Sequence, residues 1–511
     1  MEIIKNAAVL LNLRHPKKVT TVIPKSKQLD DNKVVVKWDI DAAHVLKNLN
    51  IRVPSPIQGQ YDWPGKHKPF DHQKSTAAFL TMHKRAFCFN EQGTGKTASA
   101  IWAADFLMKQ GKIKRALVVC PLSIMDSAWR SDLFEFAMHR KVDIAYGAKD
   151  KRRQIIEGDA DFVIINYDGV EIVADAVANG GFDLIIIDEA THYKNPQTKR
   201  WKTMQALIQP QTWLWMMTGT PAAQSPLDAY GLAKMINPNA VPRFFGTFRQ
   251  QVMHQITRFK WVPKEDATET VYNALQPAIR FTKEQCLDLP EMTYVKREVP
   301  LTAQQKKYYA ALQSQMLVHA DGEEITAANA AIMMNKLMQI SCGAVYSDDH
   351  ETIEFDIKNR YNVLKEVIDE SSQKVLIFVP FRHTIQLLVD RLNKDGVTAE
   401  FISGDVSAGK RTEIFKRFQE QVHPRVLVIQ PQAAAHGVTL TAANTVVWWG
   451  PTSSLETYAQ ANARVHRSGQ KHKCTVVQLQ GSSVEKHVYK MLDSRINVHT
   501  KIIDLYKELL D

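Results

Sequence analysis

Residues 90–97, with the sequence NEQGTGKT, have the glycine, lysine and threonine order of a phosphate-binding loop. They follow the apolar stretch RAFCF and precede the helix-like stretch ASAIWAADFLMKQG, which is the context that such a loop requires. Gly93 and Gly95 let backbone N–H groups close around phosphate oxygens, and the helix N-terminus adds a favourable partial positive charge. Lys96 would contact the β and γ phosphates, and Thr97 would bind magnesium. A glycine-rich turn capped by Thr97 is the alternative.

A pair of carboxylates, Asp188 and Glu189, ends the apolar run LIIIDE. Because the carboxyl ends of parallel strands meet at one edge of a sheet, we expect this pair to lie beside the phosphate loop. Asp188 suits magnesium, directly or through water, and Glu189 suits orienting or deprotonating an attacking water. A solvated acidic strand end is the alternative, which a phosphate loop upstream in the same predicted sheet disfavours.

A third segment far downstream, QANARVHRSGQ, contains Arg464 and Arg467. Their spacing predicts that both lie on one face of a helix. Arginine suits a developing phosphoryl charge because its planar guanidinium donates several hydrogen bonds and stays protonated. Taken alone, the pair is better explained as a basic, solvated helix face.

Two regions must position these residues, and both alternate short apolar strands with helix-length segments. The first contains RALVVCP, DFVIINY, FDLIIIDE and TWLWMMTGT, and the second contains KVLIFVP, RVLVIQP, TVVWWGP and TVVQLQ. Near-continuous apolar runs are typical of strands covered by helices on both sheet faces. The pattern predicts an α/β fold with two doubly wound parallel sheets.

The remaining segments complete a four-part organisation. We expect a small basic accessory domain over 1–60, with a strand at KVVVKWDI and a helix at DAAHVLKNL. The first sheet domain is expected over 61–235 and the second over 356–511, with terminal helices. Between them, 236–355 shows helical spacing and almost no strand signal, which predicts a mainly helical insert or bridge.

The composition of the chain indicates which class of partner it binds. The 511 residues carry a formal net charge of +11, which favours a polyanionic partner, nucleic acid before an anionic membrane surface. No apolar run approaches the ~18 residues of a membrane span. Five scattered cysteines argue against a disulfide framework and a zinc site. We expect an intracellular, cytoplasmic protein that does not act at a membrane.

The motifs together resemble a Swi/Snf-type ATPase of helicase superfamily two, in the compact form found in bacteria and phages. KPFDHQ resembles the motif whose glutamine reads adenine, and NEQGTGKT resembles DEMGLGKT, which also lacks an opening glycine. VVCPLSIMDSAW resembles a DNA-backbone-binding segment, and DEATHYKN resembles DEAHRLKN. TGTPAAQ and AAAHGVTLTAANTVV resemble coupling motifs, and YAQANARVHRSGQ resembles QAxDRAHRIGQ. The matches run in order over roughly 68–490.

The resemblance implies two RecA-like domains that bind ATP and Mg²⁺ and alternate between open and closed states. The ATP-binding residues would be Gln73, Gly93, Thr94, Gly95, Lys96 and Thr97, with Thr97 and Asp188 as metal ligands. Catalysis would use Glu189, Arg464 and Arg467, and coupling would use Thr218, Thr220, Gly437 and Gln460. The chain departs from the family pattern at Thr191, Ala223, Gln224, Thr439 and Ala463.

The implied function is DNA-dependent ATP hydrolysis that drives translocation on duplex DNA or remodelling of branched DNA and protein–DNA complexes. The DNA would be held mainly through its phosphates, by a monomeric protein. A strand-separating helicase or the motor subunit of a restriction system is the enzymatic alternative. An ATP-gated, non-hydrolysing DNA-binding scaffold is the alternative of another class.

Overall fold

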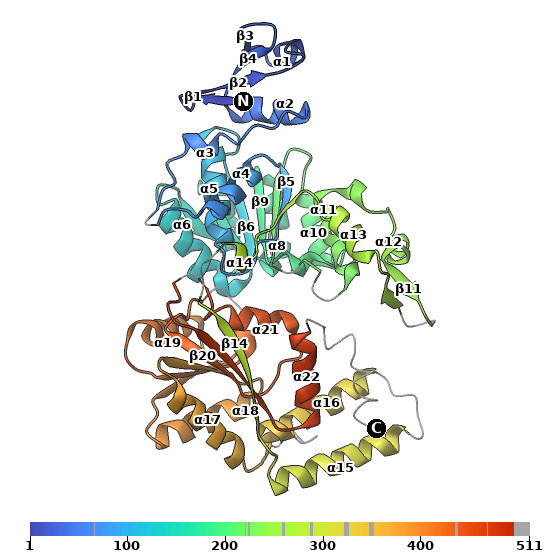
Figure 1. The fold of residues 1–511 in the computed structure, drawn as a ribbon, viewed down its shortest axis with the longest axis vertical. Coiled ribbons are helices and arrows are strands. Elements are labelled where there is room, and N and C mark those ends of the chain that lie inside the picture. The colour runs from blue at the N-terminus through green and yellow to red at the C-terminus, as the bar shows by residue number, and fades with distance from the viewer. Residues whose placement is uncertain are drawn as a thin grey trace. The chain divides into compact units, whose positions relative to one another are not determined.

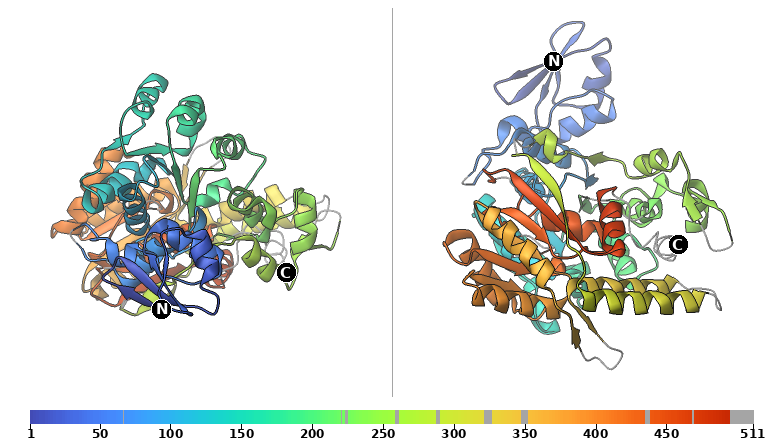
Figure 2. Two further views of the ribbon diagram at one scale, coloured as in Figure 1. Left: turned by 90° about the horizontal axis from the view of Figure 1, so that it is seen from above. Right: turned by 60° about the horizontal axis from the view of Figure 1, so that its bottom comes forward.

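The computed structural model describes the chain in ten stretches, which form two compact units, Met1–Cys286 and Leu287–Asp511 (Figures 1 and 2). The described residues are 1–65, 67–219, 221–222, 225–257, 261–286, 290–320, 327–346, 352–434, 438–467 and 469–494. Among the helices in these stretches, none is long and apolar enough to span a membrane.

The first unit opens with a small four-stranded antiparallel sheet of order β1-β2-β4-β3. Its apolar side chains Val9, Leu11, Val34 and Val36 are buried beneath two helices. The strand and helix expected in this segment are confirmed as β4 and α2. The elements are β1 (Glu2–Ile4), β2 (Ala8–Asn12), α1 (Lys17–Val22), β3 (Lys27–Gln28), β4 (Lys33–Lys37), α2 (Ile40–Asn48) and α3 (Ile57–Gln60).

A seven-stranded parallel sheet of order β13-β5-β10-β9-β6-β8-β7 forms the body of the first unit. Its strands are β5 (Arg85–Cys88), β6 (Ala116–Cys120), β7 (Val142–Ile144), β8 (Phe162–Asn166), β9 (Leu184–Asp188), β10 (Trp213–Met217) and β13 (Ala278–Ile279). The helices include α4 (Asp71–Thr81), α5 (Lys96–Lys109), α6 (Ser131–Phe136), α7 (Lys149–Ile156), α8 (Tyr167–Ile172), α9 (Ala174–Asn179), α10 (Lys199–Leu207) and α11 (Ala229–Ile236).

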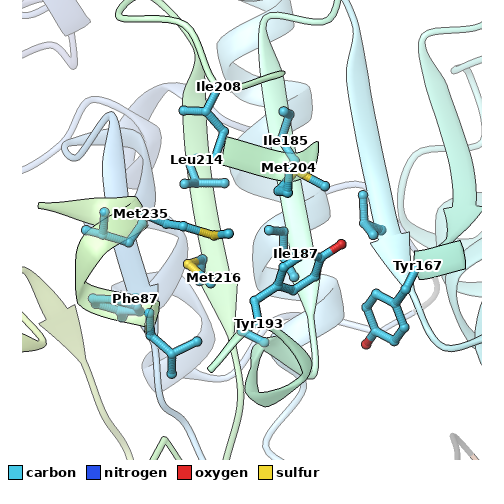
Figure 3. Close-up of a cluster of buried hydrophobic side chains, with 14 of the residues drawn as sticks. Phe87, Tyr167, Ile185, Ile187, Tyr193, Met204, Ile208, Leu214, Met216 and Met235 are labelled. Atoms are coloured by element: carbon cyan, nitrogen blue, oxygen red, sulfur yellow. The ribbon is translucent and has the colours of Figure 1, made fainter. Parts of the chain in front are cut away.

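Helices cover both faces of this sheet, as the continuous apolar strands predict. On one face, Ile185 and Ile187 of β9 and Met216 of β10 pack against Met204 of α10 and Met235 of α11 (Figure 3). The alternate strand residues point to the opposite face and pack against α5 and α6. Every residue of β6 and β9 is therefore buried, and neither strand shows the period-2 alternation of a half-exposed strand.

The second unit contains a six-stranded parallel sheet of order β14-β21-β20-β17-β19-β18, which confirms the second predicted sheet. Its strands are β14 (Met292–Glu298), β17 (Lys374–Phe378), β18 (Ala399–Ile402), β19 (Val426–Ile429), β20 (Ala443–Trp448) and β21 (Cys474–Gln480). The helices around it include α17 (Lys358–Glu370), α18 (Arg382–Lys394), α19 (Ala408–Glu420), α20 (Pro431–Ala434), α21 (Leu455–Asn462) and α22 (Ser483–Asp493).

The described part of residues 236–355 contains more helix than strand, as expected, but it also contains strands and is divided between the two units. The first unit holds α12 (Phe245–Val252), β11 (Met253–Gln255), β12 (Trp261–Pro263), α13 (Ala267–Ala274) and β13. The second holds β14, α15 (Ala303–Ala320), α16 (Ala327–Cys342), β15 (Ala344–Tyr346) and β16 (Thr352–Glu354). The expectation of almost no strand was wrong. Strand β14 lies at a sheet edge and is largely exposed, so it carries polar residues in place of an apolar run.

A buried carboxylate fastens the phosphate-loop helix to its surroundings. Asp105 of α5 is fully buried and accepts hydrogen bonds from the Tyr61 hydroxyl at 2.7 Å, His139 Nε2 at 2.8 Å and Arg140 Nε at 2.7 Å. Lys109 Nζ lies 3.3 Å away. Burial by itself raises the pKa of Asp105, but the hydrogen bonds from Tyr61 and Arg140 outweigh it and hold the pKa below its ordinary value.

We expect Asp105→Asn to lower the first unit's free energy of unfolding by about 3 kcal/mol, because it leaves the partly buried Arg140 guanidinium without its charge partner and breaks a buried hydrogen-bond network. Urea denaturation followed by tryptophan fluorescence measures this change. The folded pKa lies below that of the unfolded chain, so the stabilisation is present above about pH 4 and is lost as the pH falls through the lowered pKa.

The matched control is Asp41→Asn, which removes an exposed ion pair with Lys112. That change should cost less than about 1 kcal/mol. Equal destabilisation by the two variants would contradict the role assigned to Asp105.

Candidate nucleotide-binding site

Three adjacent parallel strands bring the candidate residues to one edge of the first sheet. In the register of β5, β10 and β9, Cys88, Met217 and Asp188 lie side by side across the sheet. The phosphate loop begins two residues after Cys88. Thr218 directly follows β10, is fully buried, and donates its backbone N–H to Cys88 O at 3.1 Å. The phosphate loop, Thr218 and Asp188 therefore share one edge, which the sequence predicted for the loop and Asp188.

The phosphate loop is built on two glycines with left-handed backbone conformations. Gly93 has a φ of 84° and Gly95 a φ of 78°, values that side-chain-bearing residues rarely adopt. A Cβ atom on Gly95 would also lie 2.0 Å from Gln73 Nε2. Gly95 immediately precedes α5, so the first N–H groups of that helix face the loop. Thr94 is buried, and its hydroxyl donates to Glu91 O at 2.7 Å.

The Lys96 amine is held within the loop by backbone carbonyl groups. Lys96 Nζ donates to Asn90 O at 2.9 Å and to Glu91 O at 3.3 Å, and the residue is only 9% exposed. These neutral acceptors leave the positive charge uncompensated, so a phosphate group at the loop would be a stronger partner. Thr97 is half-buried in the first turn of α5, next to Lys96.

Asn90, where the usual loop pattern has glycine or alanine, is a buried anchor. Its Nδ2 donates to Thr76 Oγ1 at 2.8 Å, and its Oδ1 accepts from Phe281 N at 3.0 Å. The side chain thus joins α4 to the segment that follows β13, and it is fully buried. A buried asparagine needs such partners. The residue that looked like a departure from the motif therefore fixes the start of the loop.

Two residues of α4 contact the phosphate loop. Gln73, expected to read adenine, accepts from Phe70 N at 2.9 Å and donates to Thr94 O at 3.4 Å. His72 Nε2 lies 2.8 Å from the same carbonyl oxygen and donates to it. The sequence analysis did not single out His72, although its position next to Gln73 was a signal. The adenine contact of Gln73 stays a prediction.

The backbone turns sharply between the neighbouring carboxylate residues Asp188 and Glu189. Glu189 has a φ of 48° and a ψ of 56°, a left-handed conformation typical of residues at functional sites. The Tyr167 hydroxyl supports this turn by donating to Asp188 O at 2.6 Å. Burial, followed by the negative charges of Asp188 and Glu189, raises the pKa of the Tyr167 hydroxyl, which therefore stays a donor.

Asp188 is held by Trp129, the last residue of the segment VVCPLSIMDSAW, which the sequence analysis did not assign to the nucleotide site. Trp129 Nε1 donates to Asp188 Oδ2 at 2.9 Å, and Glu189 N donates to Asp188 Oδ1 at 3.0 Å. The Asp188 residue is 7% exposed and Trp129 is fully buried. Only the tertiary structure brings Trp129 to this carboxylate, 59 residues away in the chain.

The oxygen donors of Thr97 and Asp188 fit magnesium. Mg²⁺ binds oxygen and commonly takes one or two protein ligands together with substrate phosphates and waters. Within the described stretches, no group of three or more His, Cys, Asp or Glu side chains could hold a metal ion alone.

In the second unit, Arg464 and Arg467 do not lie on a helix, and the prediction of one helical face was wrong. Helix α21 ends at Asn462, where Arg464 N bonds to Ala461 O at 3.1 Å in a turn. The Arg464 carbonyl then accepts from Leu440 N at 2.9 Å, which directs the chain away from the helix axis. Arg464 is 7% exposed.

The other candidates are placed as follows. Arg467 donates from Nη1 to Val438 O at 3.2 Å. Gln460 is 5% exposed on α21 and donates from Nε2 to Glu456 Oε1 at 3.1 Å. Thr220 and Gly437 lie outside the described residues.

The chain matches two family models, the SNF2-related domain over residues 72–343 and the helicase conserved C-terminal domain over residues 359–469. The chain belongs to the SNF2-related family. Its two sheets are therefore the paired domains of an SNF2-type ATPase of the helicase superfamily, as the motifs implied.

Relatives of this SNF2-related protein include the mouse "Chromodomain-helicase-DNA-binding protein 1-like", 24% identical over 490 residues that cover 91% of this chain and 53% of the mouse protein. This chain therefore spans about half the length of that relative. "Putative protein p41" of Acyrthosiphon pisum secondary endosymbiont phage 1 is 24% identical over 422 residues, which cover 78% of this chain and 88% of p41.

A solved structure, the Sulfolobus solfataricus SWI2/SNF2 ATPase core in complex with dsDNA, is 22% identical. The comparison covers 86% of this chain and 94% of that one, with a TM-score of 0.43.

Replacing Lys96 tests the phosphate loop. We expect Lys96→Ala to lower ATP turnover at least about a hundredfold, because a preorganised cationic donor to the phosphates is lost. Steady-state ATPase rates and thermal melting should be measured together, and the melting temperature should stay close to that of the wild type.

The control is Lys74→Ala on α4, which removes only an exposed ion pair with Asp71. It should leave turnover unchanged. Turnover near the wild-type rate in folded Lys96→Ala protein would show that the loop does not serve hydrolysis.

Proposed function

We propose that this protein is a DNA-dependent ATPase that couples ATP hydrolysis to translocation on duplex DNA or to remodelling of branched DNA and protein–DNA complexes. The observation that carries the proposal is the shared sheet edge of the phosphate loop, Thr218 and Asp188. Membership of the SNF2-related family supports the same reaction.

The first unit supplies the groups that bind and orient the nucleotide. Lys96 would exchange its bonds to the Asn90 and Glu91 carbonyls for the β and γ phosphates. Thr97 and Asp188 would hold Mg²⁺ together with phosphate oxygens, and the ion would neutralise phosphoryl charge. Glu189 would orient the attacking water or accept its proton.

Arg464 and Arg467 of the second unit are proposed to stabilise the transition state. A guanidinium group donates to equatorial phosphoryl oxygens and stays protonated. Thr218 and Gln460, and with them Thr220 and Gly437, are proposed to couple nucleotide state to DNA.

The proposed partner is duplex DNA, bound mainly through its phosphates. The formal net charge of +11 supports a polyanionic partner, and the mouse relative is named as a helicase and DNA-binding protein. Counterion release then predicts little sequence preference and an affinity that falls steeply with salt.

The arginine role makes a kinetic prediction. Arg467→Ala should lower turnover by roughly 10³–10⁵ while ATP affinity changes by only a small factor, because the interaction forms mainly in the transition state. ATPase kinetics and equilibrium binding of a slowly hydrolysed analogue separate the two effects.

As a control, Arg297→Ala removes a surface ion pair with Glu370 in the same unit and should alter neither quantity. A large loss of affinity with unchanged turnover in Arg467→Ala would assign this residue to ground-state binding instead.

The action on DNA is tested by two paired substrates. We expect duplex DNA to stimulate ATPase activity and the protein to displace a triplex-forming strand or a bound protein, without processive unwinding of a plain fork. Triplex displacement and fork unwinding should be measured at matched protein and ATP concentrations, with Lys96→Ala as control. ATP-dependent fork unwinding without triplex displacement would favour a strand-separating helicase, and DNA binding without any hydrolysis would favour a scaffold.

A further inference from the structure

Residues 280–283, here called the exit segment, lie against the first residues of the phosphate loop. They follow β13, which pairs in parallel with β5, and the first unit ends three residues after them, at Cys286. Glu91 N donates to Phe281 O at 2.9 Å, and Phe281 N donates to Asn90 Oδ1 at 3.0 Å. Both backbone polar groups of Phe281 are therefore bonded to the loop.

The carboxylate of Glu91 attaches the exit segment a second time. Glu91 Oε2 accepts from Lys283 N at 3.2 Å, and Glu91 Oε1 lies 3.6 Å from Nη2 of the half-exposed Arg280. A hydrogen bond from a backbone N–H to a carboxylate is charge-assisted, whereas an exposed ion pair is screened by water. The bond to Lys283 N is therefore the stronger of the two attachments made by this side chain.

A ring contact joins the exit segment to the middle of the loop. The Phe281 ring lies 6.0 Å, between centroids, from the ring of His72 on α4. His72 Nε2 in turn lies 2.8 Å from Thr94 O, and the Thr94 hydroxyl donates to Glu91 O at 2.7 Å. The exit segment thus contacts the loop directly at residues 90 and 91 and, through His72, at Thr94.

The two residues that hold the exit segment also supply the backbone acceptors of Lys96. Lys96 Nζ donates to Asn90 O at 2.9 Å and to Glu91 O at 3.3 Å. When Lys96 binds a phosphate group it releases these carbonyl oxygens, but the exit segment continues to hold both residues. A loop fixed at its first two residues has fewer alternative conformations to lose when it closes on phosphate.

This shared hold creates a thermodynamic link between the loop and the exit segment. If attachment of the exit segment favours the loop conformation that binds phosphate, then bound phosphate must favour attachment by the same factor. The link needs no contact beyond those within the first unit. Its direction is fixed, because nucleotide and attachment stabilise each other.

We propose that Glu91 is a positioning residue that fastens the exit segment to the phosphate loop, and that a nucleoside diphosphate or triphosphate at the loop strengthens this attachment. Nucleotide then restrains the last residues of the first unit, directly before the chain continues into the second. This inference rests on the proposed function because it requires the nucleotide site, but it requires neither DNA nor hydrolysis.

Hydrogen–deuterium exchange of the full wild-type chain, resolved to single amides, tests the link with and without ADP and Mg²⁺. The amides of Phe281 and Lys283 exchange when the segment detaches locally, so ADP should slow their exchange by roughly tenfold. The Phe87 amide is the internal control. It donates to Pro277 O at 2.9 Å in the ladder beside β13 and reports general stabilisation by the ligand.

Replacement of Glu91 tests the positioning role. Glu91→Ala removes the acceptor of Lys283 N, and we expect ADP affinity measured by calorimetry to fall by roughly tenfold, the effect of one hydrogen bond to a charged group. The extra protection of the Lys283 amide by ADP should be lost. Glu91→Gln keeps an oxygen acceptor at the same position and should retain most of the affinity and of the protection.

The matched control is Glu157→Ala, which removes an exposed ion pair with Arg153 in the same unit. It should change neither ADP affinity nor the exchange of the exit segment. Wild-type affinity and protection in Glu91→Ala, or equal losses in Glu91→Ala and Glu91→Gln, would overturn the role assigned to the Glu91 hydrogen bond.

The wild-type exchange experiment decides the inference even if Glu91→Ala does not fold. ADP binding that protects Phe281 and Lys283 no more than Phe87 would overturn the link between loop and exit segment, while the proposed function would stand. Wild-type protein that binds no ADP in the presence of Mg²⁺ would overturn the proposed function itself, and this inference with it.

Discussion

The nucleotide site depends on the register of three parallel strands. β5, β10 and β9 place Cys88, Met217 and Asp188 in one row, and each chain then leaves the sheet at the same edge. A slip of one residue in any of these strands would turn its side chains to the opposite face and move its terminal group away from the edge. Both faces are packed with apolar side chains, which makes such a slip costly. The core on both faces thus sets the geometry of the polar edge.

Buried polar contacts then hold the loop between these strand ends. Asn90 joins the loop to Thr76 and to the backbone of Phe281, and His72 holds the Thr94 carbonyl. Burying a polar group without a hydrogen-bond partner costs free energy. Loop conformations that break these contacts are therefore disfavoured, and a single loop conformation is stabilised. Lys96 is held by neutral carbonyl oxygens. This arrangement keeps the amine in place while its charge stays available to a phosphate.

Buried hydrogen bonds also link the site to more distant parts of the first unit. Asp105 fastens the far side of α5 to Tyr61 and Arg140, and Trp129 fastens Asp188 to the segment after β6. Each contact joins an element that begins or ends at the nucleotide site to an element that reaches solvent or the N-terminal region.

The sequence by itself determined the local features of this protein. The sequence predicted the two parallel sheets, the phosphate loop and the Asp188–Glu189 strand end. These features depend on short-range geometry, which apolar runs and glycine positions reveal directly. The family followed from the order of many such motifs and is confirmed. The accessory strand β4 and helix α2 were found in the same way.

Only the tertiary structure decided the remaining features. The edge strand β14 was not predicted because an exposed edge strand needs no apolar run. Helix α21 ends at Asn462, and the backbone carbonyl of Arg464 beyond it accepts from Leu440 N, 24 residues earlier in the chain. The roles of Asn90 and Trp129 depend on partners at Phe281 and Asp188. Hydrogen bonds of this kind join residues whose separation in sequence carries no period. These hydrogen bonds form only when the sheets have packed, so no local sequence pattern predicts them.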